Sequence, residues 1–564
     1  MSKTDWLYLI VITLIAGLLR LYLIDQFPIG FTADEASHGY DAFSLIQTGQ
    51  DQWGHSWPIA FQSFGDWKLP VYTYLSLIPI YLTGLSVWST RLVGAIVGSL
   101  TIPTVFFLTK ELFHSSQKYK LLPYWAALVV TLSPWHIQLS RGAYEANLTS
   151  FFLPLALWLT LIGIRSIDKL KFNWYWLLAS FSLIINLYTY HAARLATVFI
   201  GFIIITYVYY RLKDWSLILK KGWPAAVLTI IFCLPIAYSI VNGGGSRAWD
   251  VAVFNPTDNW KQLQDSRHQL VIHHTNPLIA RILYNKLTYS LARITTNYIS
   301  YISPRFLIIT GAGESTYGMI SGMGVIHITS YFFLLISGFY ALTKKNPQII
   351  LLWAILLAAI IPAALSKGNG FAANRAATML PWIQILIAAG IVYSTNWIKT
   401  KVTYPFTTKL VTASFLAIYL LSTAYFLARY FFRAPYDMAS AMSYGWDQVI
   451  AEINQGRPQS IYLDRNFTEP HIFPMFYQQI DPLLVQQQSP DWNEYQRQGF
   501  AFVDMLPQYQ LDIYTVTHVI PDEIPYRHWA IVKYNPLVPI EKFDKIIYKP
   551  GYPEPIPYIV ILKR

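Results

Sequence analysis

Long apolar runs separated by short polar segments dominate the pattern of this chain. Each run is about as long as a bilayer crossing and nearly free of charge, as a helix in hydrocarbon requires. Clear examples are 6–24, 126–139, 225–240, 349–365 and 410–428. Several such runs exclude a protein with a single membrane anchor. The first run is too long for a signal-peptide core and lacks a small-residue cleavage site, so we predict a retained span.

The runs predict a mainly α-helical, polytopic bundle of about eleven spans, or twelve to thirteen if further apolar segments cross. The segment 71–87 is long enough to cross, but a crossing there would reverse every later loop. We therefore expect it either to lie in the membrane interface or to re-enter the membrane without crossing it. The predicted spans are 6–24, 92–109, 122–139, 147–164, 174–190, 195–210, 222–241, 326–343, 348–365, 376–394 and 409–429.

Composition and charge support the membrane interpretation and add an orientation. With 54% hydrophobic and 13% charged residues and a mean hydropathy of +0.35, the chain is not an ordinary soluble protein. The net charge of +12 comes mainly from basic residues in short loops, which favours the positive-inside pattern over nucleic-acid binding. All five basic loops fall inside if Met1 is cytoplasmic. The single cysteine, Cys233, excludes an intrachain disulfide.

This orientation places most polar sequence outside the cytoplasm. The predicted membrane domain is 1–430, with outer loops 25–70 and 242–325, and the predicted soluble domain is 431–564. Alternating segments such as 460–464 and 558–562 indicate strands in that last part. We therefore expect a small extracytoplasmic α/β domain with the C-terminus in it, attached to a multi-pass protein of the plasma (cytoplasmic) membrane.

The first outer loop holds adjacent carboxylates, Asp34 and Glu35, just after the first span. A carboxylate beside lipid has its charged form disfavoured, so its pKa rises into the range of a general base. The alternative is a helix N-terminus capped by Thr32, where acidic residues favour the helix dipole. Farther along, Lys68 lies at the depth of the lipid headgroups, where it could pair with the phosphate of a lipid carrier. The alternative is an ordinary lysine that extends its charge to the membrane surface, with Asp66 as its partner.

The later outer turns carry further charged residues. Arg141 and Glu145 are four residues apart, which predicts either one ion pair or a second carboxylate that faces Asp34 across a cavity. His191, Arg194 and Arg375 follow at other outer turns. External arginines run against the usual charge bias, so they need a partner, and a phosphate or pyrophosphate at the outer interface would supply one.

The order of these motifs resembles the family 39 membrane glycosyltransferases, which include protein O-mannosyltransferases and aminoarabinose lipid A transferases. The resemblance covers roughly 1–430. The loop 311–318 departs from the pattern of many relatives, and the C-terminal domain matches nothing assignable. The segments that carry the resemblance are 32–40, 49–54, 63–70, 133–136, 140–147, 188–194 and 305–311.

The resemblance implies a GT-C fold and an enzyme that transfers a hexosyl or pentosyl group from a polyprenyl-phosphate carrier, with inversion, to a protein, lipid or glycan acceptor on the outer face. It implies that Asp34 is the base, with Glu35 beside it, and that Glu145 is a second cavity carboxylate. Lys68, Arg375 and Arg194 would hold the donor phosphate. The substrate cavity would also include Arg141, His191, Asp66 and Tyr40.

We predict no metal ion and no cofactor beyond the lipid-phosphate-linked sugar as co-substrate, because cations can neutralise a leaving phosphate. The rival hypothesis is a transporter or flippase for lipid-linked sugars, which would use the same cations without chemistry. Transporters tend to hold ionisable residues at the bilayer midplane and to show repeated halves. Here the charged candidates lie at the outer ends of the spans, which favours the enzyme.

Overall fold

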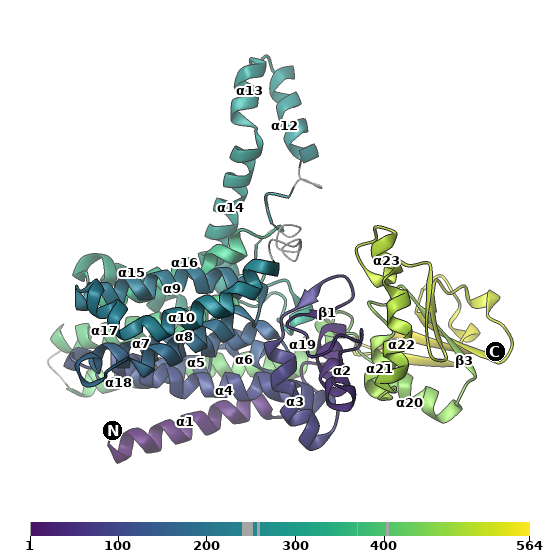
Figure 1. Cartoon of the computed structure of the whole chain (residues 1–564), viewed down its shortest axis with the longest axis horizontal. Coiled ribbons are helices and arrows are strands. Elements are labelled where there is room, and N and C mark those ends of the chain that lie inside the picture. The colour runs from purple at the N-terminus through teal and green to yellow at the C-terminus, as the bar shows by residue number, and fades with distance from the viewer. Residues whose placement is uncertain (1, 240–251, 256–259, 369, 402–404) are drawn as a thin grey trace.

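The computed structural model describes residues 2–239, 252–255, 260–368, 370–401 and 405–564. A bundle of long helices forms one end of the molecule, and a smaller domain with a β-sheet forms the other (Figure 1). The mainly helical fold and the small C-terminal α/β domain predicted from the sequence are confirmed.

Most of the bundle helices are apolar over their whole length. Their bounds are α1 Lys3–Leu21, α3 Val71–Thr83, α4 Val87–Leu112, α5 Leu122–Thr131, α6 Pro134–Ser140, α7 Thr149–Arg165, α8 Trp174–Leu187, α9 His191–Leu212, α10 Trp215–Ser239, α15 Ile328–Lys344, α16 Pro347–Ala364, α17 Trp382–Lys401 and α18 Pro405–Ala428. In the described residues, eight helices are long and apolar enough to cross a membrane. Shorter apolar helices, α8 and α15, occupy two further predicted spans. The predicted span 222–241 ends beyond Ser239, outside the described residues.

The prediction of one continuous span over 122–139 is wrong, because the helix breaks between α5 and α6. Ser133 has extended backbone angles and Pro134 begins the next helix. A proline there has no N–H to donate and its ring would clash with the carbonyl four residues earlier, so it starts a new helix.

The segment 71–87 forms α3, whose 13 residues extend about 20 Å. This length is less than the ~30 Å hydrocarbon core of a bilayer.

The outer loop predicted over 242–325 contains helices. Residues 242–251 and 256–259 of this loop lie outside the described part of the chain. The rest includes α12 Trp260–Ile272, α13 Pro277–Leu283 and α14 Lys286–Ile302. These three form a hairpin that projects from the bundle, across the direction of its long helices (Figure 1). We call residues 260–302 the arm.

The C-terminal domain contains one mixed sheet with strand order β4-β5-β3-β6-β8-β7. Strand β3 is parallel to β5 and β6, and the remaining pairs are antiparallel. The helical segment that begins with α18 continues past residue 430 through α19 Ala434–Met438. The strands are β3 Ser460–Asp464, β4 Gln508–Leu511, β5 Tyr514–Thr517, β6 His528–Lys533, β7 Lys545–Lys549 and β8 Ile556–Lys563, and the helices are α20 Trp446–Gly456, α21 Ile472–Tyr477, α22 Pro482–Trp492 and α23 Glu494–Arg497.

The first loop joins the sheet domain to the bundle. It forms α2 Ala33–Thr48 and a short hairpin of β1 Phe61–Gln62 and β2 Trp67–Lys68. Apolar side chains of α2, including Ala36, share a core with Phe476 of α21 and Ile461 of β3. Apolar burial of this kind is the main favourable term in packing two elements. The hairpin and the N-terminus of α2 are therefore held between the bundle and the C-terminal domain.

Candidate functional site

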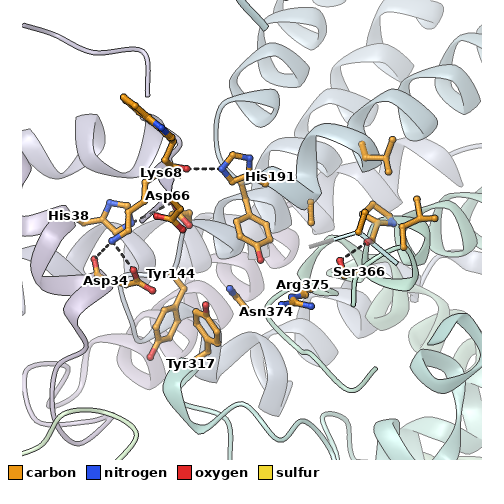
Figure 2. A pocket seen from close by; sticks show the side chains of 18 of the residues that line it. Asp34, His38, Asp66, Lys68, Tyr144, His191, Tyr317, Ser366, Asn374 and Arg375 are labelled. Atoms are coloured by element: carbon orange, nitrogen blue, oxygen red, sulfur yellow. Dashed lines mark hydrogen bonds and ion pairs between the residues drawn. The ribbon is translucent and has the colours of Figure 1, made fainter. Parts of the chain in front are cut away.

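A cavity of about 310 Å³ opens at the end of the bundle that faces the C-terminal domain. Loops that the span count placed on one side of the membrane meet there, although they are far apart in sequence. Figure 2 shows Asp34, His38 and Lys68 on one side of the cavity and Asn374 and Arg375 on the other. The structure brings together six of the ten predicted site residues in its wall: Asp34, Asp66, Lys68, Glu145, His191 and Arg375.

The local sequence of α2 explains why Asp34 faces the cavity. Thr32 and Glu35 form a capping box at the helix N-terminus. The Glu35 side chain turns inward to make it, while the Asp34 side chain stays 56% exposed. Asp34 Oδ1 lies 2.9 Å from Lys68 Nζ, and Lys68 also donates to the Asp34 carbonyl at 3.1 Å. The predicted base and a predicted phosphate ligand are thus a contact pair.

The expectation that Glu35 lines the site beside Asp34 is wrong. Its side chain is fully buried and accepts hydrogen bonds from Arg91 Nε at 2.8 Å and Arg91 Nη2 at 3.0 Å. The backbone N–H of Ala143 donates to it at 3.0 Å. A buried carboxylate needs such partners, because an unpaired buried charge is very costly. Glu35 therefore ties α2, α4 and the turn before Glu145 together.

Glu145 enters the cavity at the start of the short 3-10 helix η2 Glu145–Leu148. Its carboxylate lies 3.7 Å from His38 Nε2, and His38 Nδ1 lies 2.9 Å from Thr73 Oγ1. Burial, followed by the charge of Lys68, lowers the pKa of His38 well below its usual value. His38 is therefore neutral at pH 7, and its imidazole lies between Glu145 and Thr73 of α3.

Arg141 does not pair with Glu145 and does not line the cavity, so both expectations for it are wrong. It is fully buried, and its guanidinium group lies over two aromatic rings. It donates to backbone carbonyls at the end of α1 and just after it. The carbonyl acceptors are those of Leu19, Tyr22, Leu23 and Phe27. A buried arginine has five N–H donors to satisfy. These carbonyls accept from the two Nη groups, while Nε has no hydrogen-bond partner in the described part of the chain.

The remaining predicted residues divide between the cavity and its surroundings. Arg375 Nη1 donates to the Lys367 carbonyl at 2.9 Å, and His191 Nε2 lies 2.7 Å from the Trp67 carbonyl. Arg194 lies outside the cavity wall, because its Nε donates to the Leu187 carbonyl within the turn between α8 and α9. The prediction that Tyr40 lines the substrate cavity is also wrong. It is buried in the core shared with the sheet domain, and its hydroxyl donates to the Ile480 carbonyl at 2.7 Å.

Sequence reasoning missed several polar residues of the cavity wall. His38 is four residues after Asp34 in α2, a spacing that puts both on one helix face, so this signal was visible. The others were not predicted individually, although three belong to segments already singled out and two precede Arg375 in its turn: Tyr144, Tyr190, Tyr317, Ser366 and Asn374.

A second cavity, of about 590 Å³, adjoins the first and shares Ser366 and Arg375 with it. Its wall is rich in glycine and includes Lys367 and Glu314. Glu314 accepts the backbone N–H of Asn374 at 3.0 Å, and burial raises its pKa. The loop that departs from the family pattern, 311–318, therefore borders the site. No group of three or more His, Cys, Asp and Glu suited to a metal occurs in the described residues.

Comparisons with known proteins give a fold but no close relative. No protein-family model matches the sequence, and no curated protein matches it. ArnT from Cupriavidus metallidurans bound to undecaprenyl phosphate superposes with a TM-score of 0.56 at 10% identity, over 99% of this chain and 98% of that chain. Its apo state gives 0.52 at 10% identity, over 100% and 98%.

The Archaeoglobus fulgidus oligosaccharyltransferase matches with a TM-score of 0.48 at 13% identity, over 84% of this chain. This chain spans 63% of the length of that protein. The superposition on ArnT, in contrast, extends over nearly the whole of both chains, including the C-terminal sheet domain. The chain therefore has the fold of the GT-C membrane glycosyltransferases.

Proposed function

We propose that this protein is a membrane glycosyltransferase that transfers a sugar from a polyprenyl-phosphate carrier to an acceptor hydroxyl, with inversion at the anomeric carbon. The observation that carries the proposal is the cavity in which Asp34 and Lys68 lie 2.9 Å apart with Arg375 across from them (Figure 2). The GT-C fold supports it, and the order of the sequence motifs favours family 39 within that fold.

The arrangement suits an inverting displacement. The acceptor oxygen forms a bond to the anomeric carbon while the bond from that carbon to the phosphate oxygen breaks, and the bonding electrons leave with the phosphate. Inversion requires the acceptor and the phosphate on opposite faces of the sugar. A sugar whose reacting carbon lies beside the contact pair of Asp34 and Lys68 would meet the acceptor at Asp34 on one face. On its other face the phosphate would lie within reach of Lys68 and Arg375.

Each group then has a chemical role. Asp34 accepts the acceptor proton as general base. Arg375 and Lys68 neutralise the charge that develops on the leaving phosphate, a contribution that needs preorganised cations rather than a metal ion. Glu145, which lies beside the neutral His38, accepts a hydrogen bond from a sugar or acceptor hydroxyl. His191 and Asp66 complete the polar wall.

The proposed location is the plasma membrane, with the N-terminus cytoplasmic and the cavity and sheet domain outside. Basic residues at the opposite end of the bundle support this orientation. Lys110 pairs with Asp5 at 2.6 Å, and Arg165 pairs with Glu111 at 2.9 Å. Such residues concentrate on the cytoplasmic side of membrane proteins.

The test is transfer of radiolabelled sugar from a panel of polyprenyl-phosphate donors by the purified protein in lipid, with an acceptor extract. Asp34→Asn should lower transfer by roughly 100-fold or more, while donor binding persists. Asp437→Asn is a matched control, because Asp437 pairs with Arg433 outside the cavity. Unchanged transfer by the Asp34 variant would remove it from the mechanism. Donor binding without transfer by the native protein would favour a transporter.

A further inference from the structure

The arm, residues 260–302, has an amphipathic surface that the proposed reaction does not use. Its sequence contains five basic residues and one acidic residue, Asp265. Exposed leucine and isoleucine side chains cover the tip and the outer part of α14, such as Ile282 at 68% and Leu287 at 65%. The basic residues are Lys261, Arg267, Arg281, Lys286 and Arg293.

The apolar residues of α14 form one stripe. Leu287, Leu291, Ile294, Tyr298 and Ile302 recur at the spacing of a single helix face. The last three pack against the hydrophobic core of the bundle. The first two continue the same stripe beyond the bundle, where both are exposed. An apolar face that is buried at one end and exposed at the other predicts that something outside the chain covers it.

The contacts of α14 fix the depth of the arm relative to the membrane. Tyr298 Oη donates to the Leu357 carbonyl at 2.7 Å. Asn297 Nδ2 donates to the Ala364 carbonyl at 3.3 Å. Both acceptors belong to the last turns of α16, which is long and apolar enough to span the membrane. The α14 helix therefore crosses a membrane span near its end, at the level where hydrocarbon gives way to headgroups.

The direction of the arm and the charge of its side chains indicate what covers the exposed part of the stripe. The arm runs across the bundle helices (Figure 1), so it lies along the membrane surface rather than away from it. Its stripe faces the side on which α14 packs against α16, a helix that is long and apolar enough to cross the membrane. A helix with an apolar face and flanking cations at this depth suits an interface that carries negative charge. Lys286, held over the Trp260 ring at 4.8 Å, is the first residue of α14 and directly precedes Leu287 of the stripe.

We propose that the arm is a membrane-surface element: its apolar stripe inserts beside α16 into the leaflet on the cavity side, and its cations bind anionic lipid headgroups. The arm also connects to the site. Arg293 Nη2 donates to the Gly368 carbonyl at 2.8 Å, and Asn297 Nδ2 donates to the Ser366 carbonyl at 3.1 Å. Both carbonyls belong to the loop that precedes Arg375 and borders the two cavities.

The test measures depth with a fluorescent label in nanodiscs and needs no activity. Cys233 is the single cysteine, so a Cys233→Ser background accepts one label at a chosen position. Ile282→Cys places it on the apolar tip. Thr296→Cys is the matched control, since residue 296 is exposed and lies on the face of α14 opposite Leu287. Brominated lipid chains and aqueous iodide are the two quenchers.

Brominated chains should quench the label at 282 several-fold more than the label at 296, and iodide should show the reverse order. The difference should be larger in nanodiscs with phosphatidylglycerol than in phosphatidylcholine alone. The double variant Arg281→Gln/Lys286→Gln, which removes two positive charges, should abolish this effect of phosphatidylglycerol on quenching. Equal iodide quenching at both positions would overturn the proposal, because the arm would then lie in water. Protection of position 282 from both quenchers would also overturn it, in favour of a protein partner such as a second copy.

Discussion

The ammonium group of Lys68 lies 2.9 Å from the carboxylate of Asp34 and also donates to the carbonyl of the same residue. Lys68 is only 7% exposed in its side chain, whereas Asp34 is more than half exposed. The lysine is therefore fixed by the protein, while the carboxylate faces the space that a substrate would fill. A donor phosphate at Lys68 would compete with Asp34 for the ammonium group and release the carboxylate for proton transfer.

Replacement of Lys68 tests this relationship. Lys68→Met should lower sugar transfer by roughly 100-fold or more, because it removes a preorganised cation from the leaving phosphate. Lys68→Arg should retain part of the activity, since it keeps the charge but not the compact geometry. The measurement is initial transfer rate against donor concentration. Lys110→Met, which breaks an ion pair with Asp5 at the opposite end of the bundle, should leave the rate unchanged. Equal rates for both methionine variants would contradict the role of Lys68.

Replacement of Glu35 should destabilise the protein rather than slow a chemical step. Glu35→Gln leaves the fully buried Arg91 without its counter-charge, a loss that costs about 3–5 kcal/mol in buried pairs. The expected result is a lower denaturation temperature in detergent and less folded protein. Arg91→Met combined with Glu35→Gln should recover part of that stability. A stable Glu35 variant that has lost only turnover would restore the catalytic interpretation.

Sequence alone predicted the helical fold because apolar runs of membrane length carry a strong physical signal. It also placed Asp34, Lys68 and Glu145 correctly on one side, since counting the spans sorts the loops between the two ends of the bundle. The break at Pro134 was visible as well, although the apolar run around it favoured one continuous helix.

The predictions that placed Glu35, Arg141 and Tyr40 in the site were wrong for a different reason. Glu35 and Arg141 are polar residues next to spans, as the cavity residues are, but their partners are distant in sequence. Glu35 pairs with Arg91, 56 residues away, and Arg141 donates to carbonyls more than 110 residues away. Such pairing depends on how helices pack, which local patterns do not encode. Tyr40 was misplaced because its core includes the C-terminal domain.

The docking of the first loop on the C-terminal domain gives another prediction. The N–H of Val503 donates to the Phe64 carbonyl at 2.8 Å. A Cβ on Gly65 would lie 2.3 Å from the Ala501 carbonyl oxygen, which is closer than atoms can approach. Gly65→Ala should therefore push the hairpin away from the domain and displace Lys68 in β2. We expect weaker donor binding and a lower denaturation temperature.

The matched control for this glycine is Gly17→Ala in α1, where an added Cβ meets nothing within 4 Å. That variant should be neutral or slightly stabilising, because alanine favours helix more than glycine does. Donor affinity, measured by titration of the detergent-solubilised protein with polyprenyl phosphate, distinguishes the two variants. Equal affinity in both would show that Lys68 is held independently of the C-terminal domain.

A carboxyl pair near this contact should make stability depend on pH. Asp504 accepts the backbone N–H of Glu469 at 2.8 Å and lies 3.3 Å from the Tyr509 hydroxyl. Burial raises the pKa of Asp504 from 3.8 to about 6, and burial, followed by the charge of Asp504, raises the pKa of Glu469 as well. The folded state therefore binds more protons than the unfolded state between these values, and stability falls as pH rises from about 4 to 6.

Asp504→Asn removes that proton uptake while its amide oxygen still accepts a hydrogen bond. The denaturation temperature of this variant should fall less steeply over the same pH window, so that the variant gains stability relative to the native protein as pH rises. Asp491→Asn, at an exposed position of α22, removes a carboxyl from the same domain and should leave the native profile unchanged. Parallel profiles for the native protein and the Asp504 variant would show that Asp504 is already ionised at pH 4 in the folded state.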